Sequence, residues 1–229
     1  MSQAMPYAHN YHRWVFDAFA RHLGPGRTVE VGSGHGAYAR LLAPRVSQLV
    51  VSDIDPAAIE RLRAELAGIG NVGFAVMDGL DPAVLGEPVD NVVLLNLLEH
   101  IEGDAALLAA CHASLRPGGT LVVFSPAFPA LYARMDREAG HFRRYRRGEL
   151  ERLVEGAGFA VASSRLFNAV GFFGWYVNKL LDSGIHSAGT NAQISLYDRL
   201  VPWLKHVDAL LPFVGQSLVV VGKRPEASR

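Results

Sequence analysis

Three glycines at every second position, with one acidic residue before them and another further on, are the residues of this chain best suited to bind a ligand. The segment is Glu30-Val31-Gly32-Ser33-Gly34-His35-Gly36. Glycines at such spacing let a strand turn sharply into a helix while a ligand lies against the bare backbone. Asp53, 21 residues after Gly32, stands at the end of a second apolar run. An acid there can accept both hydroxyls of a ribose, so the pattern predicts a site for an adenosine-containing cofactor.

The glycine spacing and Glu30 distinguish between two classes of cofactor. The spacing G-x-G-x-G differs from the G-x-G-x-x-G that receives a dinucleotide pyrophosphate at a helix N-terminus. A carboxylate at Glu30, where the first predicted strand ends, would repel a pyrophosphate but suits a cationic ammonium or sulfonium. These residues favour S-adenosylmethionine over NAD. A tight strand-to-helix turn without a ligand is the structural alternative.

Further motifs, in order along residues 26–161, resemble those of class I S-adenosylmethionine-dependent methyltransferases, and in particular bacterial members that act on small molecules. The matching segments are Glu30–Gly36, Asp53–Pro56, Asp78, Asn91–His100, Leu115–Leu121 and His141–Tyr145. The resemblance implies S-adenosyl-L-methionine as cofactor and S-adenosyl-L-homocysteine as product. It implies these cofactor-binding residues: Glu30, Gly32, Ser33, Gly34, Gly36, Asp53, Ile54, Asp78, Gly79, Asn96 and Leu97.

Seven short apolar runs read as strands, most of them of the kind buried on both faces of a parallel sheet. The predicted strands are Thr28–Val31, Leu49–Ser52, Val72–Val76, Val89–Leu95, Thr120–Ser125, Phe159–Leu166 and Ser217–Gly222. Helical segments separate most of them; Pro56 begins one with Asp55 as its cap, and Asp104 can cap another. The alternation predicts an α/β fold with a doubly wound, mostly parallel seven-stranded sheet, the Rossmann-like methyltransferase fold, with ligands at the carboxyl edge.

We expect one methyltransferase domain over the whole chain. It comprises an N-terminal helix or lid at 1–25, a cofactor-binding core at 26–166, a helical insertion at 167–215, and the last strand and tail at 216–229. The aromatic-rich insertion can form a substrate wall, a structural cover or a homodimer contact. Because Leu166–Leu181 is strongly apolar, shallow contact with a membrane surface is a further interpretation.

The segment Tyr7–Leu23 predicts a helix with one apolar face for packing. Similar members of the family use such a segment to cover the cofactor. That resemblance makes Tyr7 and Tyr11 candidates to contact cofactor or substrate.

Methyl transfer needs alignment of the acceptor with the methyl group more than it needs acid catalysis, although a hydroxyl acceptor benefits from a base. Histidine has a suitable pKa, and His100 and His141 are the two candidate catalytic bases. His35, inside the glycine turn, is expected to orient the cofactor or the backbone. The alternative for His100 and His141 is purely structural hydrogen bonding.

A cluster of arginines around Tyr145 is the densest basic patch. Arg143 and Arg144 follow His141 directly, and guanidinium groups suit carboxylate or phosphate, so these two arginines and Tyr145 predict binding of an anionic small-molecule substrate. The sequence contains no clear set of metal ligands, so no metal is expected.

Composition sets the remaining limits. Lys plus Arg equals Asp plus Glu at 22 each, and this neutrality argues against nucleic acid as a partner. The single cysteine, Cys111, is expected in the core, and a cytoplasmic protein without secretory signal or transmembrane segment is predicted. We therefore expect methyl transfer to a small molecule, at an oxygen of an anionic metabolite. Transfer to carbon or nitrogen of a small or lipid-like metabolite, and a non-catalytic cofactor-binding scaffold, remain alternatives.

Overall fold

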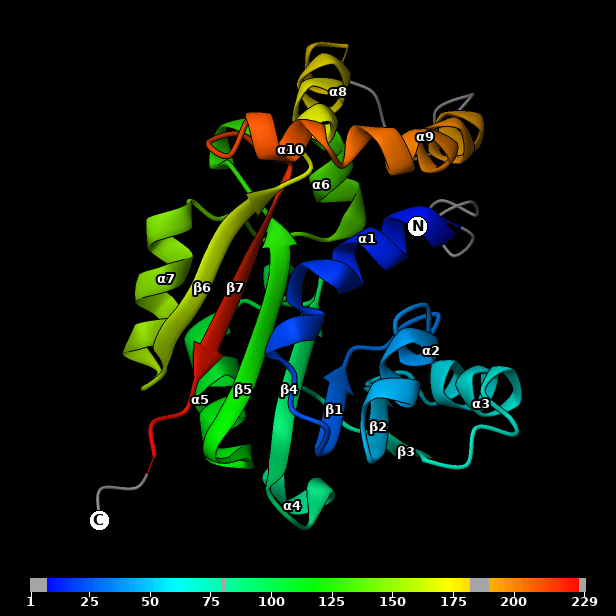
Figure 1. The fold of residues 1–229 in the computed structure, drawn as a ribbon, viewed down its shortest axis with the longest axis vertical. Helices are drawn as coiled ribbons and strands as arrows, with labels where there is room; N and C mark the ends of the chain where they lie inside the picture. The colour runs from blue at the N-terminus through cyan, green and yellow to red at the C-terminus, as the bar shows by residue number, and fades with distance from the viewer. Residues whose placement is uncertain (1–7, 80, 182–189, 227–229) are drawn as a thin grey trace.

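The structure is a computed structural model that describes residues 8–79, 81–181 and 190–226. Its strands form a seven-stranded sheet in the order β3-β2-β1-β4-β5-β7-β6 (Figure 1). The strands are β1 (Arg27–Val31), β2 (Gln48–Asp53), β3 (Val72–Val76), β4 (Val89–Leu95), β5 (Leu115–Pro126), β6 (Ala160–Phe167) and β7 (Ser217–Lys223). The first five strands pair in parallel, and β7 runs antiparallel to both β5 and β6. The predicted fold class is confirmed.

Helices cover both faces of the sheet. Towards one face lie α1 (His9–Phe19), α2 (Ala39–Leu42) and α3 (Pro56–Glu65); towards the other lie α4 (Pro82–Leu85), α5 (Asp104–Ser114) and α7 (Arg147–Gly156). Alternate strand residues feed the two cores: Val93 and Phe124 belong to the first, Val92 and Val123 to the second. Cys111 is fully buried in the second core, as its helical spacing predicts.

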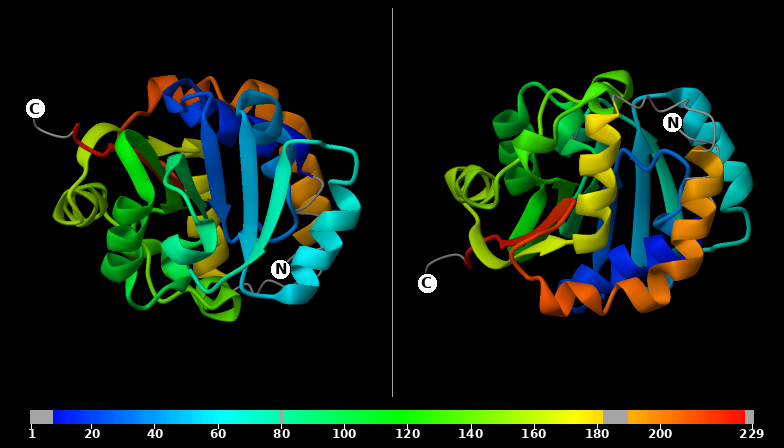
Figure 2. Two further views of the ribbon diagram at one scale, coloured as in Figure 1. Left: turned by 90° about the horizontal axis from the view of Figure 1, so that it is seen from below. Right: turned by 90° about the horizontal axis from the view of Figure 1, so that it is seen from above.

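The long insertion lies over the carboxyl ends of the parallel strands. It contains α8 (Ala169–Leu180), α9 (Thr190–Leu204) and α10 (Val207–Leu210), which Figure 1 shows above the sheet together with α6 (Arg134–Ala139). Seen from above, α8 and α9 run on opposite sides of the ends of the blue strands (Figure 2). Among the described residues, no helix combines the length and the apolar character needed to cross a membrane.

The helices of the insertion have different relations to the rest of the molecule. On α9, Asp198 accepts a hydrogen bond from the backbone N–H of Tyr11 at 2.8 Å, and Val201 is buried in the first core. Helix α9 therefore anchors α1, whose own N-terminus has no side-chain cap. Helix α8 instead leaves large apolar side chains in solvent, among them Phe173, Tyr176, Val177 and Leu180.

One predicted cap is confirmed and one is wrong. Asp55 accepts from the N–H of Ala57 at the start of α3, as expected. Gly103, not Asp104, occupies the N-cap position of α5. Asp104 is the first residue of the helix, where its Oδ1 accepts from the N–H of Ala105 at 2.8 Å while its Oδ2 receives Arg143.

Candidate cofactor and acceptor site

The glycine turn after β1 has a backbone that side chains seldom tolerate. Gly32, Gly34 and Gly36 have φ angles of +72°, +52° and +67°, in the left-handed region that favours glycine. A Cβ on Gly32 would lie only 2.8 Å from Leu97 Cδ1, whereas a Cβ on Gly34 would meet none of the described atoms within 4 Å. The turn therefore presents open backbone at Gly34. Ser33 is buried and its N–H donates to Ser52 O at 2.8 Å, which fixes the turn to β2.

Glu30 is a buried carboxylate with an unused oxygen. Its side chain is 2% exposed, and Oε2 has no hydrogen-bond partner among the described residues. Burial raises the pKa of Glu30 to about 8, although a hydrogen bond from Ser33 opposes the shift. A group that is so poorly solvated and only partly paired is suited to accept a cationic ligand.

Asp53 and Ile54 mark the carboxyl end of β2. Asp53 Oδ2 accepts from the N–H of Gly34 and Oδ1 from that of Asp55, each at 3.0 Å. The acid is thereby held against the glycine turn, as the sequence pattern requires. Ile54 is 62% exposed beside it and offers a flat apolar surface.

The other residues predicted to bind the cofactor also lie at this edge of the sheet. Asp78 is exposed after β3, and Gly79 follows it with φ +66°. Asn96 is exposed after β4 with φ +51°, and the side chain of Leu97 packs on Gly32. The structure thus brings the ends of β1 and β4 into contact, while Asp78 lies at the end of the outer strand β3.

Tyr11 lies in an aromatic cluster below the insertion, and Tyr7 lies outside the described residues. The ring of Tyr11 contacts Trp14 and Phe167, and burial raises its pKa to about 12. Both Tyr11 and Glu30 act on the buried hydroxyl of Tyr38, whose pKa is raised by burial first and then by these two neighbours.

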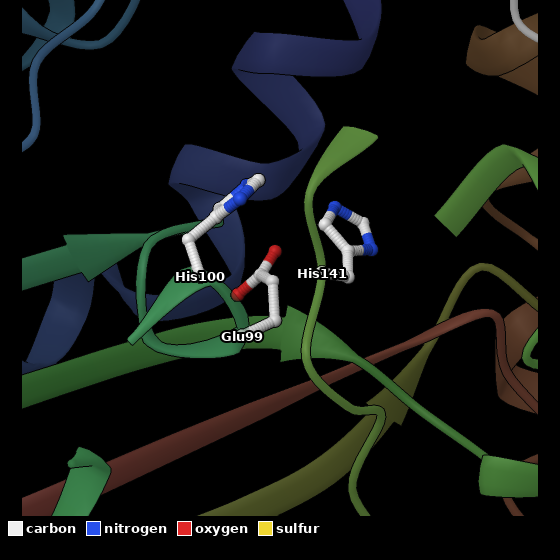
Figure 3. A group of neighbouring side chains, drawn as sticks. All are labelled: Glu99, His100 and His141. Carbon is white, nitrogen blue, oxygen red and sulfur yellow. The ribbon is translucent and has the colours of Figure 1, made fainter. Parts of the chain in front are cut away.

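Three polar side chains converge just after β4. Donor atoms of Glu99, His100 and His141 all lie within 4.8 Å of one another, and Figure 3 shows the Glu99 carboxylate between the two rings. Glu99 is fully buried; its Oε2 accepts from Ser125 Oγ at 2.8 Å, and its Oε1 has no partner among the described residues. Burial raises the pKa of Glu99 to about 7 and, with the neighbouring His141, lowers that of His100. The two histidines are candidates from the sequence, whereas their partner Glu99 is identified only in the folded structure.

His141 lies 41 positions after His100 in the sequence, and two hydrogen bonds hold its segment beside Glu99 and His100. The N–H of Phe142 donates to Glu99 O at 2.8 Å, and the hydroxyl of Tyr145 donates to Leu98 O at 3.3 Å. On its other side, Tyr145 forms an isolated parallel bridge with Ala127 at the end of β5. The segment 141–145 is therefore fixed between the ends of β4 and β5.

Asp136, in α6, orients the His141 ring. Its Oδ1 lies 2.8 Å from His141 Nδ1 and also 2.8 Å from Arg144 Nε, and its Oδ2 accepts from the N–H of Ala133. Burial alone would raise the pKa of Asp136, but the hydrogen bonds and the arginine outweigh burial and lower it. The ionised carboxylate accepts the Nδ1 proton of His141, so the neutral form of that ring would carry its lone pair on Nε2. No local spacing in the sequence marks Asp136 for this role.

The arginines predicted to bind an anionic substrate have partners within the protein. Arg144 is buried, with its Nε on Asp136 and its guanidinium 4.7 Å from the centre of the Trp175 ring. Arg143 Nη1 donates to Asp104 Oδ2 at 2.8 Å, and the Tyr145 hydroxyl reaches the same carboxylate at 2.9 Å. The free positive charge on which the prediction of an anionic substrate depended is therefore neutralised.

The sequence profile of the family described as "Methyltransferase domain" matches residues 6–164. A protein of Mycolicibacterium smegmatis named "Probable S-adenosylmethionine-dependent methyltransferase" is 28% identical over 156 residues, which are 66% of this chain and 58% of that protein. The ubiquinone biosynthesis O-methyltransferase of Cereibacter sphaeroides is 32% identical over 98 residues, 42% of this chain and 39% of that protein. The chain thus spans about half the length of these curated relatives.

Among solved structures, the N-methyltransferase NodS of Bradyrhizobium japonicum, in complex with S-adenosyl-L-homocysteine, superimposes with a TM-score of 0.61. The match covers 98% of this chain and 89% of that chain at 16% sequence identity. At this identity the likeness concerns the fold.

Proposed function

Because this chain belongs to the methyltransferase domain family of S-adenosylmethionine-dependent enzymes, we propose that it transfers a methyl group from this cofactor to an oxygen of a small-molecule acceptor. The observation that carries the proposal is the buried Oε2 of Glu30, which has no partner among the described residues and lies beside a turn of three left-handed glycines. The ammonium or sulfonium of the cofactor would supply a positive partner for this carboxylate.

The residues present fit the cofactor. Glu30 would face the cationic end of the cofactor, and the cofactor would lie against the open backbone at Gly34. Asp53 would accept hydrogen bonds from the ribose hydroxyls. The exposed Ile54 and Asp78 would flank the adenine. When bound, S-adenosylmethionine supplies an electrophilic methyl carbon that takes an electron pair from the acceptor while the carbon–sulfur pair stays on a neutral thioether.

The protein's part is to place the acceptor and to remove its proton. His100 follows Leu97, which packs on the glycine turn, and the ring centre of His141 lies 4.6 Å from that of His100, so both would stand beside the proposed cofactor site. The lowered pKa of His100 favours a neutral ring, and Asp136 orients the ring of His141 through Nδ1. A hydroxyl acceptor needs such a base, whereas an amine needs less help, and the pair of histidines therefore favours oxygen.

The proposed acceptor is not required to be an anion, because Arg143 and Arg144 already have carboxylate partners. Apolar rings stand near this edge instead: Phe128 contacts Phe172 of α8 with ring centres 5.2 Å apart, and Phe172 contacts Phe173. These contacts support an acceptor with an apolar body and a hydroxyl group.

Two measurements test the proposal. Calorimetric titration with S-adenosyl-L-homocysteine, with NAD as control, should give saturable binding of the former alone. Incubation with S-adenosylmethionine and a panel of phenols, alcohols and amines should then give methylated product with the hydroxyl compounds. Binding without turnover on any acceptor would favour a scaffold role, and product from amines alone would overturn the assignment of oxygen.

A further inference from the structure

We infer that Glu99, His100 and His141 bind a divalent first-row transition metal ion such as Zn²⁺, Mn²⁺ or Co²⁺. The inference rests on the proposed function in one respect: the role of the ion, which is to bind the acceptor hydroxyl. One carboxylate and two imidazoles are a donor set that divalent transition metals accept while retaining open positions for a further ligand. Neither the family profile nor the relatives described above are named for a metal.

The geometry of the three side chains is close to that of a formed site. Their candidate donor atoms lie within 4.8 Å of one another. Two ligands of one tetrahedral zinc ion, each about 2.1 Å from it, are about 3.4 Å apart. Small rotations of the half-buried rings of His100 and His141 would close that difference, while the buried Glu99 stays in place.

Each of the three groups has a lone pair to give. His141 uses Nδ1 to donate to Asp136, which leaves Nε2 for an ion. One nitrogen of the His100 ring bonds to the backbone of Gly140, and the second nitrogen would serve as the ligand atom. Glu99 uses Oε2 for Ser125, and its buried Oε1 has no partner in the part of the chain that the structure describes.

The unpaired Glu99 oxygen is the independent observation in favour of a cation. A buried carboxylate oxygen without a partner is costly, and proteins seldom retain one without a ligand to satisfy it. The nearby Arg144 does not fill this role, because its Nε is on Asp136 and its Nη1 donates to Ala127 O. A cation between Glu99 and the two rings would satisfy the oxygen directly.

The surroundings resemble the outer shell of a metal site. Asp136 fixes the ring of His141, Ser125 fixes the carboxylate of Glu99, and the N–H of Phe142 ties its own segment to Glu99 O. Outer partners of this kind set the orientation of metal-bound imidazole and carboxylate groups. The donor atoms are therefore held before any ion arrives, which lowers the entropy lost on binding.

In the proposed reaction the ion would hold the acceptor hydroxyl and lower its pKa. The O–H bond breaks and the proton passes to water. The oxygen keeps the electron pair of that bond and gives a pair to the methyl carbon; the metal keeps its oxidation state. His100 and His141 would then act as ligands and not as bases.

The test uses the full chain, freed of metal with a chelator and titrated with CoCl₂ while visible absorption is recorded. Saturable d–d bands with one Co²⁺ per chain are expected, with displacement by ZnSO₄. Glu99→Gln and His141→Ala should each weaken Co²⁺ binding at least tenfold, whereas His206→Ala, which changes an exposed histidine after α9, should not. Thermal melting of each variant checks that it folds.

The outcomes separate the metal site from the proposed function. Absence of saturable bands, or equal affinity in wild type, Glu99→Gln and His141→Ala, would overturn the metal site. Calorimetry with S-adenosyl-L-homocysteine on the same metal-free samples tests the proposed function independently. Cofactor binding without Co²⁺ binding leaves the histidines as bases, and Co²⁺ binding without cofactor binding refutes the methyltransferase assignment while keeping the metal site.

Discussion

The Nδ1 atom of His141 lies 2.8 Å from Oδ1 of Asp136, a carboxylate that is fully buried in α6. This contact fixes both the tautomer and the direction of a ring that faces Glu99 and His100 across the carboxyl edge of the sheet. The same oxygen receives Arg144, so one carboxylate connects the proposed acceptor site to the helix α8 above it.

Replacing Asp136 with asparagine should lower kcat for methyl transfer while leaving cofactor affinity unchanged. An amide can donate to Nδ1 and thereby move the ring proton to Nε2, where a lone pair is needed. Loss of such an orienting partner reduces activity by roughly 10- to 100-fold. Steady-state kinetics with saturating cofactor measure the effect. A parallel rise in the Kd of S-adenosyl-L-homocysteine would show instead that Asp136 serves the cofactor site.

Asp53→Ala should weaken binding of S-adenosyl-L-homocysteine at least about tenfold, because the ribose hydroxyls lose a charged acceptor worth more than 1.4 kcal/mol. Asp55→Ala is the matched control two positions away. Asp55 caps α3, so its loss should lower the free energy of unfolding by about 1 kcal/mol without changing affinity. Calorimetry and urea unfolding separate the two effects. Equal affinity in wild type and Asp53→Ala would refute the ribose assignment.

Glu30 should make the protein without cofactor less stable as the pH rises. Its pKa is about 8 in the folded state and 4.5 as the ordinary value, so between these the folded chain binds the additional proton. Stability then falls with rising pH in this window. Between pH 6.5 and 8 the free energy of unfolding of the wild type should fall by roughly 2 kcal/mol more than that of Glu30→Gln. The buried His12, with its pKa lowered by burial to about 4, is neutral throughout that range.

The measurement is the free energy of unfolding from urea titrations at several pH values, for wild type and Glu30→Gln. Saturating S-adenosyl-L-homocysteine should flatten the slope of the wild type and have little effect on the variant. If the unfolding free energies of the two proteins have the same pH dependence without ligand, Glu30 is ionised in the folded state and its pKa is not raised as predicted.

Arg144→Ala should destabilise the protein by about 3 to 5 kcal/mol, because it leaves the buried Asp136 without its positive partner. Arg143→Ala breaks a more exposed pair with Asp104 and should change stability by no more than about 1 kcal/mol. Thermal and urea unfolding report both values. Arg143→Ala should also leave the KM of the acceptor unchanged; a marked rise in that KM would support an anionic substrate.

The glycine turn, the strands and the acids Glu30 and Asp53 could all be predicted from the sequence. Each of these features depends on the order of neighbouring residues, since the spacing of glycines, the length of an apolar run and the residue that ends a strand are local. Long-range contacts could not be predicted in this way. Asp104 follows a plausible capping pattern and accepts from the N–H of Ala105, but α5 begins one residue earlier than that pattern implies, and the second carboxylate oxygen of Asp104 receives Arg143, 39 positions away.

The proposed acceptor site was decided by tertiary structure. His100 and His141 could be singled out by residue type, but their approach to Glu99 follows from the bond between Phe142 N and Glu99 O. Likewise, the run of arginines suggests free positive charge, but in the folded chain Arg144 forms an ion pair with Asp136. The sequence determined the residue types and the edge of the sheet to which they belong. Pairing of their charges and donor atoms required folding, because it depends on distances between segments that local spacing does not encode.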